Sequence, residues 1–316
     1  MQPRPKENPL VSVVITTYNH AILLRHAIKT VAEQDYRPLE IIVADDESTD
    51  GTQALVEGLD NPAVRYLKLK HSGYPSVTLA EGIKAARGDI IMCLEGDDQY
   101  LPGKIATQVE YLAAHPLCDF VFADIYHVEG VERDFIVPDP ARHETYFSNV
   151  RPPTGPLAIR NFFPVPPVHI NTVAMRRRVV EKVLPTNGFR YIWDWDFELR
   201  VLKNGFIMQA MFGVVAVYRR NRKGLSSSVQ SILKAAEEQM RLIGHYRDDL
   251  PPGVHDAMVE RWRYDWVKQA MKFDQLQSLE GLRKSPHFPA SPIYRLKAVF
   301  YLAQTRAKYR FTSWKP

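Results

Sequence analysis

Polar residues follow three of the first four predicted β-strands, at the point where each strand ends. The segments are Leu10–Thr17 followed by Tyr18-Asn19, Leu39–Ala44 followed by Asp45-Asp46-Glu47-Ser48, and Asp89–Leu94 followed by Glu95-Gly96-Asp97-Asp98. In an open parallel sheet these ends gather along one edge, where such folds bind ligands. Two acidic clusters on one edge repel each other unless a cation or a hydrogen-bonded ligand lies between them. The pattern therefore predicts a metal and a nucleotide at this edge, and so an enzyme.

The order of the predicted elements indicates an α/β domain followed by helices. Strand and helix patterns alternate up to Glu129, as in a parallel sheet with right-handed crossovers. Residues 130–168 then contain eight prolines and little periodicity, which is typical of a functional loop. Beyond Ser226 the pattern is helical, with helices expected at about 230–246, 254–273 and 292–309. We therefore predict a domain at residues 1–225 and a helical region at residues 226–316.

The composition, 45% hydrophobic and 24% charged residues, is that of a soluble globular protein. No run of about eighteen apolar residues predicts a transmembrane helix, and the first residues lack the apolar core of a signal peptide. A cytoplasmic protein is therefore expected. Cys93 and Cys118 each lie in an apolar predicted strand, where a free cysteine behaves as a small buried hydrophobe.

The two acidic clusters suit different parts of a nucleotide ligand. Glu95-Gly96-Asp97-Asp98 can hold Mg²⁺ or Mn²⁺ while diphosphate oxygens complete an octahedral shell, or it can form a solvated turn that caps the next helix. Asp45 and Asp46 can accept hydrogen bonds from a base or ribose. The first strand is followed by Thr16–His20 without a glycine, and no Walker sequence is present. We expect the base, the ribose and a metal to hold the nucleotide.

A third acidic group lies downstream, in Trp193-Asp194-Trp195-Asp196-Phe197-Glu198. On a helix, Asp194 and Glu198 share a face. Bulky apolar neighbours raise the pKa of a carboxyl, which suits a general base. The same pattern also fits a helix N-terminus with ordinary caps, and the tryptophan faces suit either a sugar ring or a protein core.

Taken together, these motifs resemble those of the inverting family 2 glycosyltransferases, which have the GT-A fold. The matching segments are Val11–Asn19, Ile41–Thr52, Glu95–Asp98 and Trp193–Asp196, in a region spanning residues 10–225. The resemblance implies a Rossmann-like, mostly parallel sheet flanked by helices, with a C-terminal helical extension. It also implies a nucleotide-sugar donor and an Mn²⁺ or Mg²⁺ cofactor.

The resemblance assigns roles to the residues at matching positions. Thr16, Tyr18 and Asp46 would contact the nucleoside, with Asp45 beside them. Asp97 and Asp98 would handle the ribose and the metal, with Asp98 as the expected direct ligand. Asp194 would be the general base that deprotonates an acceptor hydroxyl. Independently of the resemblance, the aromatic faces of Trp193 and Trp195 could contact that acceptor.

Several positions depart from the family pattern. Glu95 stands where aspartate is commoner, and Leu79-Ala80-Glu81-Gly82 lacks the usual arginine-asparagine pair, so Lys84 or Arg87 could supply the missing cation. The last core strand is followed by arginines where many relatives have a histidine.

Two further sets of residues have two possible roles each. Arg220 and Arg222 could neutralise the diphosphate or form a solvated basic loop, and His169 could touch the acceptor or be structural.

The last segment of the chain is basic and partly apolar. Residues 290–316 contain six Lys and Arg residues and no acidic residue, and Ile293 and Leu296 recur at helical spacing. Such a helix can lie in an anionic membrane interface, or it can pack on the catalytic domain with a basic outer face. Nucleic-acid binding is not expected, because the basic patch is short and no recognition motif accompanies it.

The sequence thus predicts a metal-dependent inverting glycosyltransferase acting on a glycan or lipid-linked glycan, in bacterial surface glycan synthesis by family analogy. A non-catalytic nucleotide- or glycan-binding module of the same fold is the alternative from another class. Salt bridges that bury Asp194 away from the metal site would favour that module. A sugar nucleotidyltransferase is a third hypothesis, although it usually needs a glycine-rich phosphate loop that this chain lacks.

Overall fold

The protein, seen here as a computed structural model, is described at residues 8–129, 135–136, 138–139, 144–149, 155–162, 166–220, 228–272, 284, 288–299 and 301. It divides into two compact units, residues 1–221 and 222–316. The sequence prediction had placed the boundary four residues later, at 225/226. Each unit has hydrophobic side chains clustered in its own interior.

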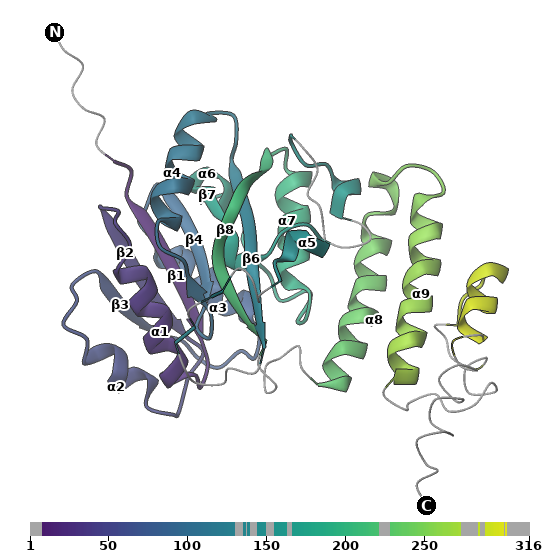
Figure 1. Cartoon of the computed structure of the whole chain (residues 1–316), viewed down its shortest axis with the longest axis horizontal. Helices are drawn as coiled ribbons and strands as arrows, with labels where there is room; N and C mark the ends of the chain where they lie inside the picture. The colour runs from purple at the N-terminus through teal and green to yellow at the C-terminus, as the bar shows by residue number, and fades with distance from the viewer. Residues whose placement is uncertain are drawn as a thin grey trace, which may run out of the picture. The chain divides into compact units, whose positions relative to one another are not determined.

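The first unit contains an eight-stranded sheet in the order β3-β2-β1-β4-β7-β6-β8-β5 (Figure 1). The strands are β1 Val11–Thr17, β2 Leu39–Asp45, β3 Val64–Lys68, β4 Ile90–Glu95, β5 Gln99–Tyr100, β6 Phe120–Glu129, β7 Ala174–Arg176 and β8 Met208–Arg220. Parallel pairs join β3 to β2, β2 to β1, β1 to β4, and β6 to β8. The short strands β7 and β5 pair antiparallel. The predicted mostly parallel α/β sheet is confirmed.

Helices cover both faces of this sheet. They are α1 Ala21–Ala32, α2 Thr52–Glu57, α3 Pro75–Ala85, α4 Lys104–Ala114, α5 Tyr146–Asn149, α6 Arg177–Val180 and α7 Trp193–Lys203, with 3-10 turns η1 Ile159–Phe162 and η2 Ile170–Thr172. Residues on α1 and α4 share a core with Val13 of β1. Its neighbour Val14 points to the opposite face, where Gly82 of α3 lies against it. Alternate residues of this β-branched strand are therefore buried on both sides, as is typical of parallel sheets with helices on both faces.

The parallel register brings the expected polar residues to one edge. Thr17 at the end of β1 lies opposite Asp45 at the end of β2. On the other side, Thr16 lies opposite Glu95 at the end of β4. The end of β1 therefore separates the two acidic motifs and lies beside both.

A short strand follows the second acidic motif before the next helix. Helix α4 begins only at Lys104, because Gln99 and Tyr100 first form β5 against β8. The Leu101 N–H continues this pairing and donates to the Val215 carbonyl at 2.9 Å. The acidic motif is thus held between β4 and β8.

The second unit is helical where it is described. It contains α8 Val229–His245, the turn η3 Arg247–Asp249, α9 Val254–Lys272 and a helical segment at 292–299. Buried Ala298 packs with Val267 of α9, and the rings of Tyr294 and Tyr264 are 5.8 Å apart. The last helix therefore packs on α9, and the predicted residues 302–309 of that helix lie outside the described part. Within the described residues, no helix has both the length and the apolarity needed to cross a bilayer.

Candidate active site at the carboxyl edge of the sheet

Main-chain hydrogen bonds fix both acidic motifs to the end of β1. The N–H of Gly96 donates to the Thr16 carbonyl at 2.8 Å, and the N–H of Asp46 donates to the Thr17 carbonyl at 3.0 Å. A Cβ atom on residue 96 would lie 2.8 Å from the Thr16 oxygen, so the close approach requires glycine. The contact between the ends of β1 and β4 therefore requires a glycine within the second acidic motif.

Asp45 has an internal structural role, and its predicted place beside the nucleoside stays a prediction. It is fully buried. Its Oδ1 accepts hydrogen bonds from the main chain and hydroxyl of Ser48 at 3.1 and 2.5 Å, and its Oδ2 accepts one from the Tyr66 hydroxyl at 2.5 Å. Both oxygens are occupied, so Asp45 shapes the turn that follows β2.

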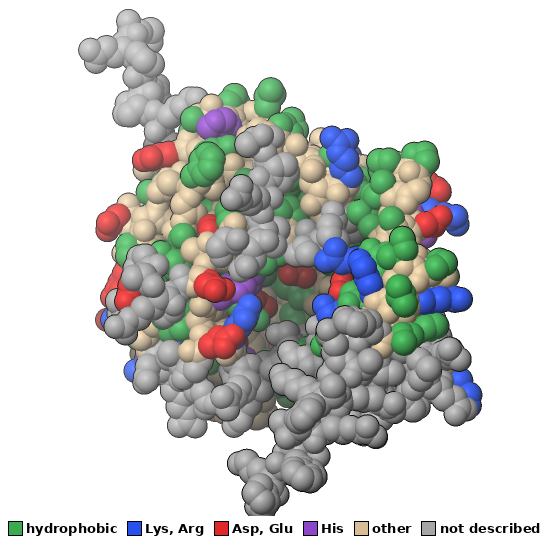
Figure 2. Space-filling view, turned by 45° about the vertical axis from the view of Figure 1, so that its right-hand side comes forward, with side chains coloured by type: hydrophobic (Ala, Val, Ile, Leu, Met, Phe, Trp, Pro, Cys, Tyr) green, Lys and Arg blue, Asp and Glu red, His purple; other side chains and the backbone are tan. Residues whose placement is uncertain are grey.

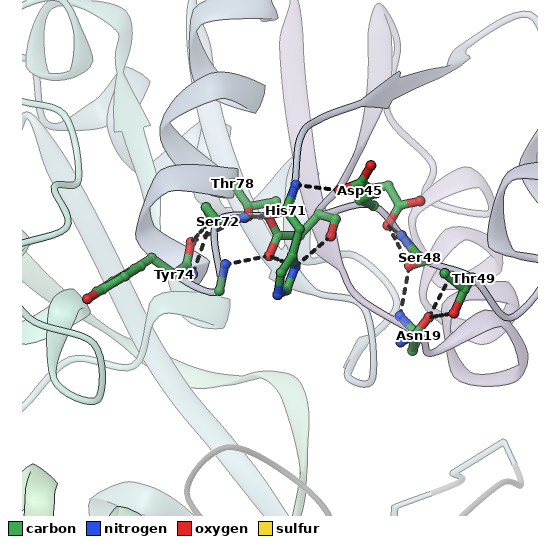
Figure 3. A network of polar contacts seen from close by, with 11 residues as sticks. Asn19, Asp45, Ser48, Thr49, His71, Ser72, Tyr74 and Thr78 are labelled. Atoms are coloured by element: carbon green, nitrogen blue, oxygen red, sulfur yellow. Dashed lines mark hydrogen bonds and ion pairs between the residues drawn. The ribbon is translucent and has the colours of Figure 1, made fainter.

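Asp46 holds the segment between β3 and α3. Its carboxylate accepts hydrogen bonds from the main-chain N–H groups of Ser72 and Gly73 at 2.8 and 3.0 Å, and its Oδ2 lies 2.9 Å from Nδ1 of His71. Figure 3 shows this network beside a second one, in which Asn19 Oδ1 accepts a hydrogen bond from the Thr49 N–H at 2.7 Å. The loops after β1, β2 and β3 are thus tied together.

This network places an aromatic pair at the sheet edge. The rings of Tyr18 and His71 stack with their centroids 4.6 Å apart and an interplanar angle of 27°. Tyr18 is 44% exposed, so the pair offers a ring surface at the edge of the protein. Sequence reasoning identified Tyr18 but missed His71. In the sequence, His71 could be noticed only as a histidine three residues after the end of β3.

The two adjacent aspartates of the second motif differ in their surroundings. Asp98 is 1% exposed, its Oδ1 accepts the Arg219 N–H at 2.7 Å, and its Oδ2 accepts the side-chain amide of Asn171. Burial and then the charges of Asp97 and Glu95 raise the pKa of Asp98. These two donors fix the orientation of the Asp98 carboxylate, and its role as the direct metal ligand stays a prediction.

Asp97 is the more available carboxylate. It is half-buried, and its carboxylate has no hydrogen bond or ion pair to any residue that the structure describes. Its main-chain carbonyl accepts the Arg219 Nε–H at 3.0 Å. Burial and then the charges of Asp97 and Asp194 raise the pKa of neighbouring Glu95 to about 8. The charges of Asp97 and Asp194 therefore both act on Glu95.

Asp194 lies in the first turn of α7. Its Oδ1 accepts the Trp195 N–H at 2.9 Å, and burial raises its pKa. No salt bridge involves Asp194 in the described part of the chain, whereas the next carboxylate, Asp196, pairs with Arg200 at 2.9 Å. The arrangement that would favour a non-catalytic module is thus not observed, and the charge of Asp194 acts on Glu95 of the acidic motif.

Comparison with known proteins identifies the family. Residues 12–184 match the family model described as Glycosyl transferase family 2. The chain belongs to this family. It is 35% identical over 105 residues to the GalNAc(5)-diNAcBac-PP-undecaprenol beta-1,3-glucosyltransferase of Campylobacter jejuni, covering 32% of this chain and 34% of the relative. It is 35% identical over 102 residues to the succinoglycan biosynthesis protein ExoO of Rhizobium meliloti, covering 32% of this chain and 29% of the relative. The chain thus spans about a third of the length of these relatives.

Solved structures of glycosyltransferases confirm the GT-A fold. Residues 1–349 of S. aureus TarS superpose with a TM-score of 0.59 at 17% identity, covering 96% of this chain and 91% of that one. The mannosyltransferase PcManGT from Pyrobaculum calidifontis, in complex with GDP-Man and Mn²⁺, superposes with a TM-score of 0.59 at 20% identity. That match covers 97% of this chain and 88% of the other.

The residues present in this family 2 protein fit a divalent cation that the substrate helps to hold. No three His, Cys, Asp or Glu side chains converge as a metal site among the residues described. Mg²⁺ typically takes one or two carboxylates together with substrate phosphates, so a complete protein cage is not required. Asp97 and Glu95 offer oxygen ligands, and a cation would offset the burial and the neighbouring negative charges that together raise the pKa of Glu95.

The other predicted cation and acceptor residues have varied places in the family 2 fold. Trp193 and Trp195 are 6% and 2% exposed, so they belong to the core and present no open ring face. Arg87 pairs with Glu40 at 3.1 Å, at the opposite end of the strands, and Lys84 pairs with Glu81 at 2.6 Å. Neither replaces the missing family arginine at the carboxyl edge. Arg222 lies outside the described residues.

Two of the predicted residues lie together near the end of β8. Arg220 pairs with Glu129 at 2.8 Å and its guanidinium contacts His127 at 3.0 Å. His169 is part of an aromatic group with His127. Sequence reasoning missed the neighbouring Arg219, which is 1% exposed and whose guanidinium donates to the Gln99 side chain at 3.2 Å. Its contacts with residues 97–99 join positions 120–122 residues apart in the sequence. No local sequence pattern could therefore indicate them.

Proposed function

We propose that this chain is a metal-dependent inverting glycosyltransferase that moves a sugar from a nucleoside diphosphate sugar to an acceptor hydroxyl. The observation that carries the proposal is that Asp194, on α7, acts electrostatically on Glu95, which ends β4 at the carboxyl edge of the sheet. Asp194 has neither a salt bridge nor a side-chain donor within the described residues, and burial makes it more basic. A general base needs both properties.

The proposed chemistry uses Asp194 to activate the acceptor. Its carboxylate takes the proton of the acceptor hydroxyl as that oxygen bonds to the anomeric carbon of the donor sugar. The bond from this carbon to the nucleoside diphosphate breaks on the opposite face, so the configuration inverts. Alignment of donor and acceptor on rigid elements supplies a large part of the rate gain.

The nucleoside diphosphate would lie along the edge formed by β1, β2 and β4. The exposed Tyr18–His71 pair offers a stacking surface for the base. Thr16 lies between the two acidic motifs, and Asp46 positions the His71 loop. Asp97, with Glu95, would hold Mn²⁺ or Mg²⁺, which neutralises charge on the leaving diphosphate when bound. The Mn²⁺ and GDP-Man bound to PcManGT support this cofactor and this donor class.

The biological role that we propose is bacterial surface glycan synthesis. The relatives from C. jejuni and R. meliloti are named for an undecaprenol-linked glycan and for succinoglycan. An acceptor sugar carried by a glycan or a lipid-linked glycan would suit both precedents. The non-catalytic module and the nucleotidyltransferase are less well supported, because Asp194 lies at the acidic edge and no phosphate-binding glycine loop follows β1.

The deciding experiment measures nucleoside diphosphate release across a panel of nucleotide sugars, with Mn²⁺, Mg²⁺ or EDTA. We expect one donor to be turned over only with metal. The change Asp194→Asn should lower kcat by about 10²–10⁴-fold while donor affinity is kept, because a neutral amide cannot accept the proton. Donor binding without turnover by the wild type, with varied acceptors present, would favour the binding module.

Asp196→Asn is the matched control for this experiment. It makes the same chemical change two residues along α7, at a carboxylate that pairs with Arg200. We expect it to lower stability by about 1–3 kcal/mol and to leave kcat per folded molecule close to that of the wild type. An equal loss of kcat in both variants would contradict the assignment of Asp194 as the base.

We also propose that the helical segment at 292–299 binds the anionic inner face of the cell membrane. Ile293 and Leu296 are 66% and 73% exposed, and the neighbouring residues Arg295 and Lys297 are exposed as well. The other side of the segment packs on α9 through Ala298. Figure 2 shows hydrophobic and basic side chains side by side on the surface of the helical unit. Apolar insertion combined with cationic attraction is typical of interfacial helices.

Vesicle flotation tests the membrane proposal. The wild type should float with phosphatidylglycerol vesicles and much less with phosphatidylcholine vesicles. Replacing Ile293 and Leu296 together by serine should abolish flotation, because each loses its apolar contact with the lipid. Phe212→Ser is the control, since Phe212 is 97% exposed on β8 of the other unit. Flotation that is unchanged in the double variant would refute the assignment.

A further inference from the structure

Four aromatic side chains from four separate segments meet beside the end of β6. They are His127 on β6, Tyr146 on α5, His169 at the start of η2 and Tyr218 on β8, and we call them the imidazole–tyrosine cluster. The His169 and Tyr218 ring centroids are 4.9 Å apart. The His127 ring lies 5.5 Å from Tyr218 and 5.6 Å from Tyr146. Proposed glycosyl transfer does not account for this cluster.

Hydrogen bonds assign the same tautomer to both imidazoles. The Arg220 guanidinium can only donate, so Nδ1 of His127 accepts at 3.0 Å. Nδ1 of His169 accepts the Asn171 N–H at 3.4 Å. Burial and then the charge of Arg220 lower the pKa of His127, and burial and then His127 lower that of His169 to about 3. Both rings are therefore neutral and carry their proton on Nε2.

The Nε2–H of His127 is a buried donor without an acceptor among the described residues. Leaving such a donor unpaired is unfavourable, and structures usually give it a partner. An oxygen atom of a bound molecule would satisfy it. The surrounding rings and the neutral imidazole favour an uncharged oxygen over a phosphate or carboxylate, because Arg220 is already paired with Glu129 at 2.8 Å.

One member of the cluster, Tyr146, is within electrostatic reach of the proposed general base. Burial and then the charges of Glu198 and Asp194 raise the pKa of Tyr146, so its phenol is within the electrostatic reach of both carboxyls. The Tyr146 ring is also a direct neighbour of His127. Tyr146 therefore connects the unpaired donor to the place where an acceptor hydroxyl would lose its proton.

We infer that the imidazole–tyrosine cluster binds a pyranose ring of the acceptor, with the Nε2–H of His127 donating to one of its oxygen atoms. The apolar C–H face of a pyranose packs on aromatic rings, and its hydroxyl and ring oxygens accept hydrogen bonds. His127 is in this view a specificity-determining residue. The inference rests on the proposed function, since it names the substrate class of the same site.

Two substitutions of His127 separate its ring from its donor. His127→Phe keeps an aromatic ring and removes the N–H, whereas His127→Gln keeps an N–H donor near the position of Nε2. Transfer to p-nitrophenyl pyranosides and hydrolysis of the nucleotide sugar by water are measured for each variant. We expect His127→Phe to raise the acceptor KM about tenfold, the size of one neutral hydrogen bond, with donor KM and hydrolysis unchanged. His127→Gln should remain closer to the wild type.

His115→Phe is the control, because His115 also stacks on a tyrosine, Tyr111, with centroids 4.0 Å apart on α4. It should leave every parameter unchanged. An unchanged acceptor KM in His127→Phe would overturn the inference. Equal losses of transfer and hydrolysis would overturn it as well, since they would mark the cluster as packing alone.

A binding measurement distinguishes failure of this inference from failure of the proposed function. If the wild type neither transfers sugar from any nucleotide sugar nor hydrolyses one, the proposed function fails, and the cluster is then tested alone. Side-chain ¹⁵N–¹H spectra of histidine are followed during titration with methyl pyranosides. A saturable shift of the His127 resonance that is absent from the spectrum of His127→Phe supports a pyranose site. No shift up to the solubility limit of the sugar overturns it.

Discussion

Asp97 and Asp98 are adjacent in the sequence, yet their carboxylates have different surroundings. Asp98 faces inward, where the Arg219 main chain and the Asn171 amide use both of its oxygens. The Asp97 carboxylate has no such partner in the described part of the chain, and its charge contributes to the raised pKa of Glu95, after burial. Hydrogen bonding thus leaves the Asp97 carboxylate with more free acceptor positions than the Asp98 carboxylate. The family resemblance singled out Asp98 as the direct ligand, but no sequence pattern indicates which of two adjacent aspartates is hydrogen-bonded in the fold.

The raised pKa of Glu95, about 8, makes the stability of the metal-free protein depend on pH. An unfolded glutamate ionises above about 4.3. Between that pH and 8 the folded state binds the extra proton, so the free energy of unfolding falls as pH rises and levels off above 8. Denaturant titrations with EDTA should show this decline, and Glu95→Gln should make it shallower. Mn²⁺ should stabilise the wild type more at pH 8 than at pH 6, and an unchanged slope in Glu95→Gln would contradict the assignment.

At the scale of elements, the junction of β1 and β4 positions the second acidic motif. Gly96 allows the two strand ends to approach, because any side chain there would meet the Thr16 carbonyl and the Thr17 side chain. The same junction connects to β2 through the hydrogen bond from the Asp46 N–H to the Thr17 carbonyl. A change at residue 96 should therefore disturb both the metal-binding and the nucleoside-binding parts of the edge.

Gly96→Ala tests this junction. We expect a loss of about 1–3 kcal/mol in the free energy of unfolding, typical of overpacking, together with weaker donor binding. Thermal unfolding and nucleotide titration measure the two effects. Gly244→Ala in α8 is the matched control, because nothing lies within 4 Å of its added Cβ, and alanine there should be neutral or stabilising. Equal behaviour of the two variants would exclude the proposed steric constraint.

The elements that could be predicted from the sequence are those long enough to show a clear apolar pattern. The apolar run of β1 and its polar end required no tertiary information, and the same holds for β2 and β4. Strands β5 and β7 have only two and three residues, too few to show a period of two. The inward turn of Asp45 depends on Tyr66 of the neighbouring strand, and that contact exists only after the sheet has formed.

At the scale of the whole molecule, the family match ends at residue 184, but the sheet does not. Strand β8 pairs with both β6 and β5, and α7 carries Asp194. A fragment of residues 1–184 should therefore lack cooperative unfolding and near-ultraviolet circular dichroism, whereas residues 1–221 should show both. Thermal scans of the two fragments measure this difference. Cooperative unfolding of the shorter fragment would mean that β8 is dispensable for the first unit.

The contacts of Arg219 also determine when, during translation, the acidic edge can be completed. Asp98 emerges from the ribosome 121 residues before Arg219, its main-chain donor. At synthesis rates of about 5–20 residues per second, this interval lasts roughly 6–24 s. During that time the Asp98 carboxylate lacks its main-chain donor from β8. The edge of β6 that will later pair with β8 is also unpaired. The catalytic edge is thus among the last parts of the first unit to be completed, so a nascent chain cannot acquire a finished site before nearly all of that unit has been translated.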